Sequence, residues 1–354
     1  MKYRGLVFFL LLLIQHHTVF HQVNAVDGFI KTRGLQFMLN GTPFYANGFN
    51  AYWLMNLASD PSQRNKVSDG ETRGLLGSLR NRDHTLTSSL SDETLLDQTP
   101  SSTPQTKPIT WAFGDGGYKP LQSSPGPYNQ DMFKARRYGI KLILSFVNNY
   151  ENLGGRKQYA WFTEMASYVK SIDRNHLLEA GLEGFYRQTS PQRKQFNTKF
   201  RVGTDFIANN QILDFATIHS YPDQWVSSSN DQAQMSFLNN WLDTHIQDAQ
   251  YMIRKPLLLA EFGKSSKDPG YSTYQRESVF HAVYNKVDVA AKSGGATAGS
   301  LFWQLLTEGM NSYGDGYEIV LSKSPSTANM IAQQSHKLLL VRKMYIRLRN
   351  SEKW

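Results

Sequence analysis

The chain has 354 residues, of which 38 are Lys or Arg and 29 are Asp or Glu, giving a formal net charge of +9; 40% are apolar and 13% aromatic. This apolar and aromatic content excludes wholesale disorder, and the length fits one large barrel or two ordinary domains. The absence of Cys excludes a disulfide-stapled scaffold, thiol catalysis and thiolate metal sites.

Residues 1–25 have the pattern of a secretory signal peptide. Lys2 and Arg4 precede a nine-residue apolar block at 6–14, and Val23-Asn24-Ala25 supplies small residues for a cleavage site. The alternative is an N-terminal membrane anchor, but nine apolar residues are too short to span a bilayer. We therefore expect a secreted protein of the extracellular space or cell wall, with no membrane segment after signal cleavage.

Six apolar runs rich in β-branched and aromatic residues recur along the rest of the chain, separated by stretches long enough for helices. They lie at 44–49, 141–147, 176–184, 215–221, 256–263 and 298–305. Residues 165–172 and 237–252 have helical periodicity. Alternating strands and helices predict a parallel sheet, and the repeat length indicates an α/β fold of the TIM (β/α)8-barrel type.

Residues 66–108 do not fit this pattern. The 57 residues between Trp53 and Trp111 contain no Phe, Tyr or Trp, and 85–106 contains 11 Ser or Thr among 22 residues. Such a segment buries too little apolar surface to offset the entropy of ordering it, so we expect a disordered insertion. Only 110–113 resembles a strand end. The second strand is therefore expected to be degraded, in an incomplete or distorted barrel that forms a single domain over 26–354.

Polar or aromatic residues end most of the predicted strands. They are Asn148-Asn149, Glu183, His219-Ser220-Tyr221, Glu261 and Trp303-Gln304. Because the active sites of such barrels lie at the carboxyl ends of the strands, these side chains are expected to converge on one mouth. The pattern indicates an enzyme.

Read with their neighbours, three of these strand ends are His219-Ser220-Tyr221, Glu261-Phe262-Gly263 and Phe302-Trp303-Gln304. In these motifs the sequence resembles the plant endo-β-1,4-mannanases of glycoside hydrolase family five. The resemblance covers most of the chain apart from the insertion and the tail. It extends through 45–55, 110–113, 115–117, 144–149, 181–186, 202–207, 267–270 and 323–329.

This resemblance implies an endo-1,4-β-mannosidase that hydrolyses internal bonds of mannan, glucomannan and galactomannan by a retaining mechanism. Such enzymes use two carboxyl groups about 5–5.5 Å apart, one attacking the anomeric carbon and one protonating the leaving oxygen. Glu261 matches the nucleophile, and His219 and Tyr221 match groups that orient it and bind sugar. Trp303 would form a platform under that sugar, and Trp111 would line the opposite side of the cleft. Core packing is the alternative role for both tryptophans.

The sequence departs from the family at the proton donor. The family carries its acid/base Glu in a Trp-Glu-Leu-Met-Asn-Glu-Pro stretch at the fourth strand, and no Asn-Glu-Pro occurs here. The chain passes directly from Tyr159 to the helix around Glu164, so we expect the fourth strand and the acid/base Glu to be absent. Ile109 also stands where the family has an active-site Arg. Loss of a positioned acid removes a contribution of about 10²–10⁴-fold.

Three other carboxylates could replace the missing acid. Glu164 corresponds to an outer helix, where a solvated role is expected. Glu183 ends a predicted strand on the correct rim, but the family has a Glu there in addition to its acid. Glu151 lies in a loop after the run at 141–147 and has no better support.

Two other hypotheses stand beside the active enzyme. One is a catalytically inactive cell-wall protein that binds mannan through its aromatic cleft. The other is a defective gene or a misassembled reading frame, in which 66–108 is a translated intron and skipped exons account for gaps after Ala135 and near Trp161. Sequencing the transcript across these junctions distinguishes them, because recovery of an Asn-Glu-Pro segment restores the enzyme.

No metal or cofactor is predicted. The nine His residues include no HExxH arrangement, and no Gly-rich phosphate loop occurs. Lys and Arg are scattered, so nucleic acid is not an expected partner. The resemblance implies mannan-type polysaccharides as the partners, and the oligomeric state is left open. In the C-terminal tail, basic residues alternate with apolar ones, which predicts a solvated amphipathic helix.

Overall fold

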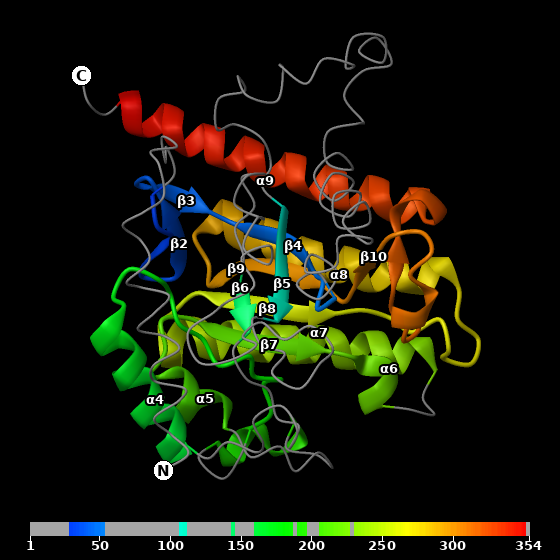
Figure 1. Ribbon diagram of the computed structural model, residues 1–354, viewed down its shortest axis with the longest axis horizontal. Helices are drawn as coiled ribbons and strands as arrows, with labels where there is room; N and C mark the ends of the chain where they lie inside the picture. Colours follow the sequence, from blue (N-terminus) through cyan, green and yellow to red (C-terminus); the bar gives the residue numbers. More distant parts are fainter. Residues whose placement is uncertain are drawn as a thin grey trace, which may run out of the picture.

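The computed structural model describes residues 28–53, 106–111, 143–145, 159–186, 190–196, 205–226 and 230–351. Its centre is a six-stranded sheet in which every neighbouring pair is parallel (Figure 1). Across the sheet the order is β6 (Ile143–Ser145), β5 (Thr106–Trp111), β4 (Ala46–Asn50), β9 (Thr297–Phe302), β8 (Leu257–Phe262) and β7 (Ala216–Ser220). This order sets the last of the six strands beside the first, as a (β/α) barrel requires. Among the described strands β6 and β7 are edges, so the barrel is not closed.

The segment predicted as a strand at 176–184 is not one, and that prediction is wrong. It lies beside β7 and is tied to it by a hydrogen bond of 3.0 Å from the His219 amide to the Glu183 carbonyl. Gly181 and Gly184 have φ angles of 56° and 107°. These left-handed residues interrupt the extended backbone that a continuous ladder needs. Between β6 and β7, the described residues therefore contain no strand.

The boundary predicted for the insertion is also wrong. β5 begins at Thr106, inside 66–108, because Thr106 and Lys107 pair with Asn47 and Gly48 of β4. The second strand therefore has six residues and pairs on both sides. The rest of the insertion, the predicted signal peptide and Glu151 lie outside the described residues.

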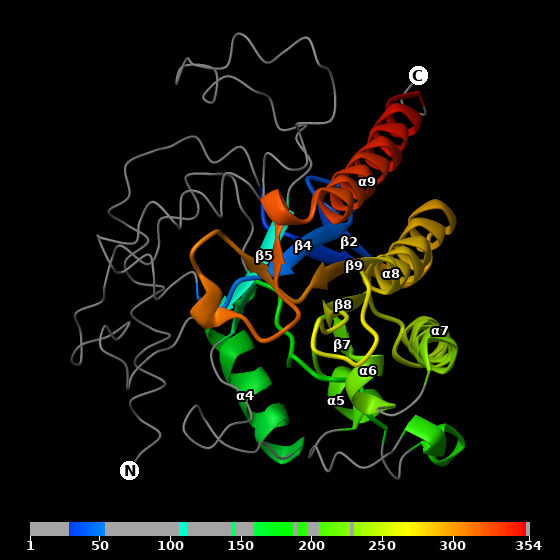
Figure 2. The same cartoon turned by 90° about the vertical axis from the view of Figure 1, so that its right-hand side faces the viewer.

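Helices cover the outside of the sheet. The long helices α7 (Asp231–Asp248), α8 (Thr273–Ser293) and α9 (Pro325–Ser351) lie side by side, and α4 (Tyr159–Ile172) and α5 (Phe206–Asn210) lie below (Figure 2). The helical predictions at 165–172 and 237–252 are confirmed, the second as α7 with the π-helical turn Ala249–Ile253. Ser272 and Gln275 form a capping box on α8, which stops at Gly294 in the left-handed conformation. Among the helices that the structure describes, none has the length and hydrophobicity of a transmembrane span.

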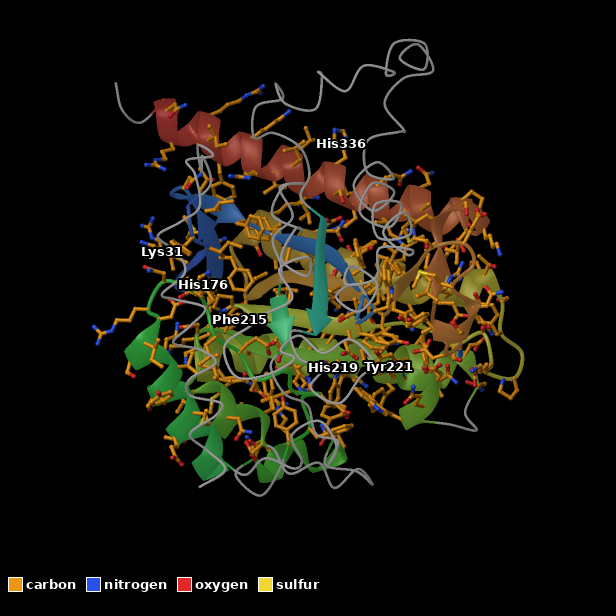
Figure 3. All side chains as sticks on the ribbon, in the orientation of Figure 1. Lys31, His176, Phe215, His219, Tyr221 and His336 are labelled. Atoms are coloured by element: carbon orange, nitrogen blue, oxygen red, sulfur yellow. The ribbon has the colours of Figure 1, made fainter. Side chains whose placement is uncertain are left out.

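The amino-terminal end of the sheet is covered by a small antiparallel sheet of β1 (Lys31–Arg33), β2 (Gln36–Leu39) and β3 (Thr42–Phe44). The ring of Phe37 on β2 meets Phe215, just before β7, edge-on at 5.0 Å. Figure 3 shows Phe215 at one end of β7, with His219 and Tyr221 toward the other. This end of the molecule is therefore a packed core, and the polar strand ends lie at the opposite end.

The remaining short elements are α6 (Pro222–Trp225), the parallel pair β10 (Leu305–Leu306) and β11 (Ile319–Val320), and the 3-10 turns Pro191–Phe196, Asn311–Tyr313 and Leu321–Lys323. All of them except Pro191–Phe196 come after the carboxyl end of β7 or β9. Because α6 and the loop containing Asn311–Tyr313 follow β7 and β9, they form part of the rim around the predicted site.

Candidate active site

Glu261 is a polar residue in an otherwise buried strand. It is the fifth residue of β8, its four predecessors are buried, and its own side chain is 21% exposed. On the neighbouring strand β7, the register pairs His219 with Glu261 after an irregularity at Ile218/His219. The sheet thereby brings Nδ1 of His219 to 3.4 Å from Oε2 of Glu261.

Tyr221 supplies the second contact to the same oxygen. It occupies the N-cap position of α6, immediately after β7, and its hydroxyl donates a hydrogen bond of 2.7 Å to Oε2 of Glu261. Within the described part of the chain, Oε1 of Glu261 accepts no hydrogen bond. The predicted cluster of Glu261, His219 and Tyr221 is therefore present, with one carboxylate oxygen held and the other available for reaction.

Burial dominates the electrostatics of this cluster. It raises the pKa of the Glu261 carboxyl to about 7; the Tyr221 hydrogen bond lowers that pKa and the charge of Asp315 raises it. Burial also lowers the pKa of His219 to about 4, against the opposing effect of Glu183. At neutral pH the imidazole is therefore uncharged, and its contact with Glu261 is not an ion pair.

Trp303 lies on the same rim, directly after β9. Its amide donates to the Phe262 carbonyl at 2.9 Å, which ties it to the residue that follows Glu261. Its indole Nε1 donates to Oδ2 of Asp315 at 2.5 Å, and its rings stack on Tyr52 with centroids 5.8 Å apart and planes 6° from parallel. The indole is thus fixed by a hydrogen bond at its edge and an aromatic ring against it, which suits it to serve as a rigid apolar surface.

Trp111 is placed by its backbone alone. It is the last residue of β5 and pairs with Ser145 of β6. Its position at the carboxyl end of a strand agrees with the predicted rim. Its side chain is not among those described, so the cleft-lining role stays a prediction.

The charge of Glu261 acts on two further carboxyl groups, Glu183 and Glu179. Burial raises the pKa values of Glu183 and Glu179, and the charge of Glu261 raises both further. Glu179 is occupied by the Gly181 amide and, at 3.3 Å, by the Thr217 hydroxyl. Glu164 is exposed on α4, as expected for a solvated residue. The absence of a dedicated acid/base residue stays a prediction from sequence.

Three residues that contact the site do not follow from the sequence analysis: Tyr52, Asp315 and Tyr317. Tyr52 follows β4 by two residues, so the rule that strand ends carry the site could have found it. Asp315 and Tyr317 lie in the Gly-rich stretch at 314–317, after the last strand of the large sheet, and only the tertiary fold returns that loop to Glu261.

Within the described ranges, no group of three His, Asp or Glu side chains could hold a metal ion. The chemistry of the site is that of a carboxylate beside a phenol, a neutral imidazole and an indole.

Solved structures share this fold. A glycoside hydrolase family 5 mannosidase from Rhizomucor miehei superposes with a TM-score of 0.66 at 15% identity, covering 90% of this chain and 99% of that one. An endo-1,4-β-mannanase from the same fungus gives 0.60 at 20% identity, covering 88% and 99%. These likenesses show a fold of the TIM-barrel type and confirm the predicted fold class, although the described strands do not close.

Sequence comparison narrows the assignment. A family model described as GH family 5 β-mannosidase-like matches residues 147–311. The chain is 47% identical to mannan endo-1,4-β-mannosidase 7 of Arabidopsis thaliana, covering 92% of this chain and 89% of the relative, and 43% identical to mannan endo-1,4-β-mannosidase 1 of Oryza sativa subsp. japonica over the same shares. The chain belongs to the plant mannan endo-1,4-β-mannosidase family. The Arabidopsis match extends over 414 positions, more than the 354 residues here, so parts of that relative have no counterpart in this chain.

Proposed function

We propose that this protein hydrolyses internal β-1,4-mannosidic bonds of mannan, glucomannan and galactomannan with retention of configuration. The single observation that carries the proposal is the fixed carboxylate: Glu261 at the end of β8, held through Oε2 by Tyr221 with His219 alongside. Family membership supplies the substrate class. Secretion by way of a signal peptide at 1–25 is part of the same proposal, because mannans are polysaccharides of the cell wall.

The reaction has two steps. Glu261 forms a bond from its free oxygen to C1 of the sugar as the bond from C1 to the leaving oxygen breaks, and that oxygen takes up a proton from solvent water. Water then attacks C1 and gives its proton to solvent as the bond between C1 and Glu261 breaks, which releases both the sugar and the Glu261 carboxylate. His219 and Tyr221 keep the nucleophile oriented, and the Trp303 indole stacks on the C–H face of the sugar.

The sequence lacks the Asn-Glu-Pro segment that carries the family's acid/base Glu, so protonation of the leaving oxygen is the step that limits the reaction. We infer that the first step on natural mannan is slowed by about 10²–10⁴-fold, the usual contribution of a positioned acid. A leaving group that departs without protonation bypasses this limit. Activated aryl mannosides are therefore expected to react faster, relative to mannan, than they do with relatives that carry the motif.

A burst experiment tests the proposal. The purified protein is mixed with a dinitrophenyl β-mannobioside, and release of the phenol is followed before steady state. We expect a burst close to one equivalent of enzyme that Glu261→Ala abolishes, with Glu164→Gln on the outer face of α4 as the matched control that keeps it. A burst unchanged by Glu261→Ala would refute the proposal. Mannan binding without any burst would favour the inactive mannan-binding protein.

A further inference from the structure

Asp223 and Tyr317 form a buried hydrogen-bonded pair close to the candidate site. Oδ2 of Asp223 in α6 accepts a hydrogen bond of 2.8 Å from the Tyr317 hydroxyl and one of 2.9 Å from the Ser265 amide. Asp223 is 6% exposed and Tyr317 7%. Because Asp223 follows β7, Ser265 follows β8 and Tyr317 follows β9 and β10, this carboxylate joins the loops of three neighbouring strands.

The ring of Tyr317 packs against the residue that contacts Glu261. It meets the Tyr221 ring edge-on, with centroids 5.1 Å apart and planes at 73°. Gly263 permits this approach, because a Cβ there would lie 2.8 Å from Cδ1 of Tyr317. Gly316 is also required, since its φ is +105° and a Cβ would lie 2.6 Å from Oγ of Ser265. The local sequence is thus adapted to seating Tyr317 at this position.

α6 needs such an anchor. It is a single turn of four residues, and its N-cap, Tyr221, makes no side-chain capping hydrogen bond. Short helices are marginal on their own, so tertiary contacts hold this one. Gln224 of the same helix donates a hydrogen bond of 2.8 Å to the Tyr317 hydroxyl. The Tyr317 hydroxyl is therefore hydrogen-bonded to two residues of α6, Asp223 and Gln224.

We propose that Tyr317, anchored by Asp223, is a positioning residue that holds the Tyr221 hydroxyl on Glu261. This inference rests on the proposed role of Glu261 as the nucleophile. Burial raises the pKa of the Tyr317 phenol, so its hydroxyl stays protonated and donates throughout the working range. Loosening Tyr221 withdraws a hydrogen bond that lowers the pKa of Glu261, while His219, Asp315, Glu179 and Glu183 continue to face it.

The test uses Tyr317→Phe, which keeps the ring and removes the hydroxyl. The full chain is treated with a β-mannobiosyl fluoride fluorinated at C2: Glu261 bonds to C1, fluoride leaves without protonation, and the ester accumulates. We expect the rate of labelling to fall roughly tenfold, the equivalent of one hydrogen bond. We also expect the acid limb of its pH–rate profile, which reports the ionisation of Glu261, to move to higher pH. The matched control is Tyr284→Phe, a buried phenol whose hydroxyl has no hydrogen-bond partner in the described part of the chain.

Each outcome decides the matter. Wild-type protein that is never labelled refutes the function of Glu261 and with it this inference. Labelled wild type with the same rate and acid limb in Tyr317→Phe overturns the inference alone. A slower rate with an unmoved acid limb also overturns it, because a merely structural role lowers the amount of folded protein without changing the ionisation of Glu261. If Tyr317→Phe does not fold, Asp223→Asn is measured in its place and is expected to move the limb in the same direction.

Discussion

Tyr221 donates its hydroxyl hydrogen to Oε2 of Glu261 at 2.7 Å, from a helix turn on one strand end to the carboxylate on the next. Two opposing effects set the pKa of the Glu261 carboxyl, and this hydrogen bond is one of them. Burial raises the pKa of the carboxyl, and the phenol partly restores the ionised form needed for attack on C1. The first prediction follows from that balance.

Replacement of Tyr221 by Phe is expected to raise the pKa of Glu261 above its value of about 7 and to lower kcat/KM on an aryl mannoside. Loss of a hydrogen bond to a charged group corresponds to about 10–100-fold. Because the nucleophile acts as the anion, the acid limb of kcat/KM moves to higher pH. Profiles for wild type and Tyr221→Phe check this, and superimposable acid limbs would contradict it.

Asp315 is expected to act in the opposite sense. Its charge raises the pKa of Glu261, so Asp315→Asn moves the acid limb to lower pH. The same change weakens the hydrogen bond that holds the Trp303 indole, so KM for mannobiosides rises. Exposed Asp243 on α7 provides the control Asp243→Asn, for which both parameters are expected to stay unchanged. A shift of the limb in the same direction as for Tyr221→Phe would contradict the assignment.

The pH dependence of the free energy of unfolding gives an independent test of the raised pKa of the Glu261 carboxyl. The native pKa of Glu261 lies at about 7 against an ordinary value of 4.5, so its contribution is fully present below pH 4.5 and is lost as the pH rises through 7. The free energy of unfolding of wild type minus that of Glu261→Gln should fall by about 3 kcal/mol between pH 4 and 8. His219 is present in both proteins and cancels from this difference. Urea titrations across this range measure it, and parallel curves would exclude the raised pKa.

Gly299 is expected to be essential for the sheet. Its φ is 153°, and a Cβ there would lie 2.2 Å from the carbonyl oxygen of Ala46 on β4. Gly299→Ala should cost at least about 3 kcal/mol, because both strands must separate. Gly309 has a φ of 79°, but a Cβ there would meet nothing within 4 Å, so Gly309→Ala should cost only about 1 kcal/mol of strain. Thermal melting of the two variants compares them, and equal midpoints would contradict the close approach of β4 and β9.

The sequence was most informative where burial is continuous. The strands around 46–50, 257–262 and 297–302 and the helices at 165–172 and 237–252 follow from runs of apolar residues and from helical periodicity. The segment at 176–184 has the composition of a strand but contains Gly181 and Gly184 at positive φ, which composition does not reveal. β5 was predicted too short because Thr106 and Lys107 acquire strand structure by pairing with β4.

The residues of the candidate site likewise divide into those that stand at strand ends and those that only tertiary packing brings to the site. Glu261, His219 and Tyr221 were predictable because each stands at a strand end, where barrel geometry gathers side chains. Asp315 and Tyr317 were not, because they come from a loop whose return to the site depends on tertiary packing. Their contacts with Trp303 and Tyr221 show that the environment of the nucleophile is built from long-range partners.

Identification of the residue labelled by the C2-fluorinated mannobiosyl fluoride tests the central claim most directly. After proteolysis and mass spectrometry, the added sugar should be found on the peptide containing Glu261 and assigned to that side chain, at a rate that increases as the pH rises through about 7. A stable ester on any other carboxylate would contradict the claim, as would complete absence of labelling in a folded protein.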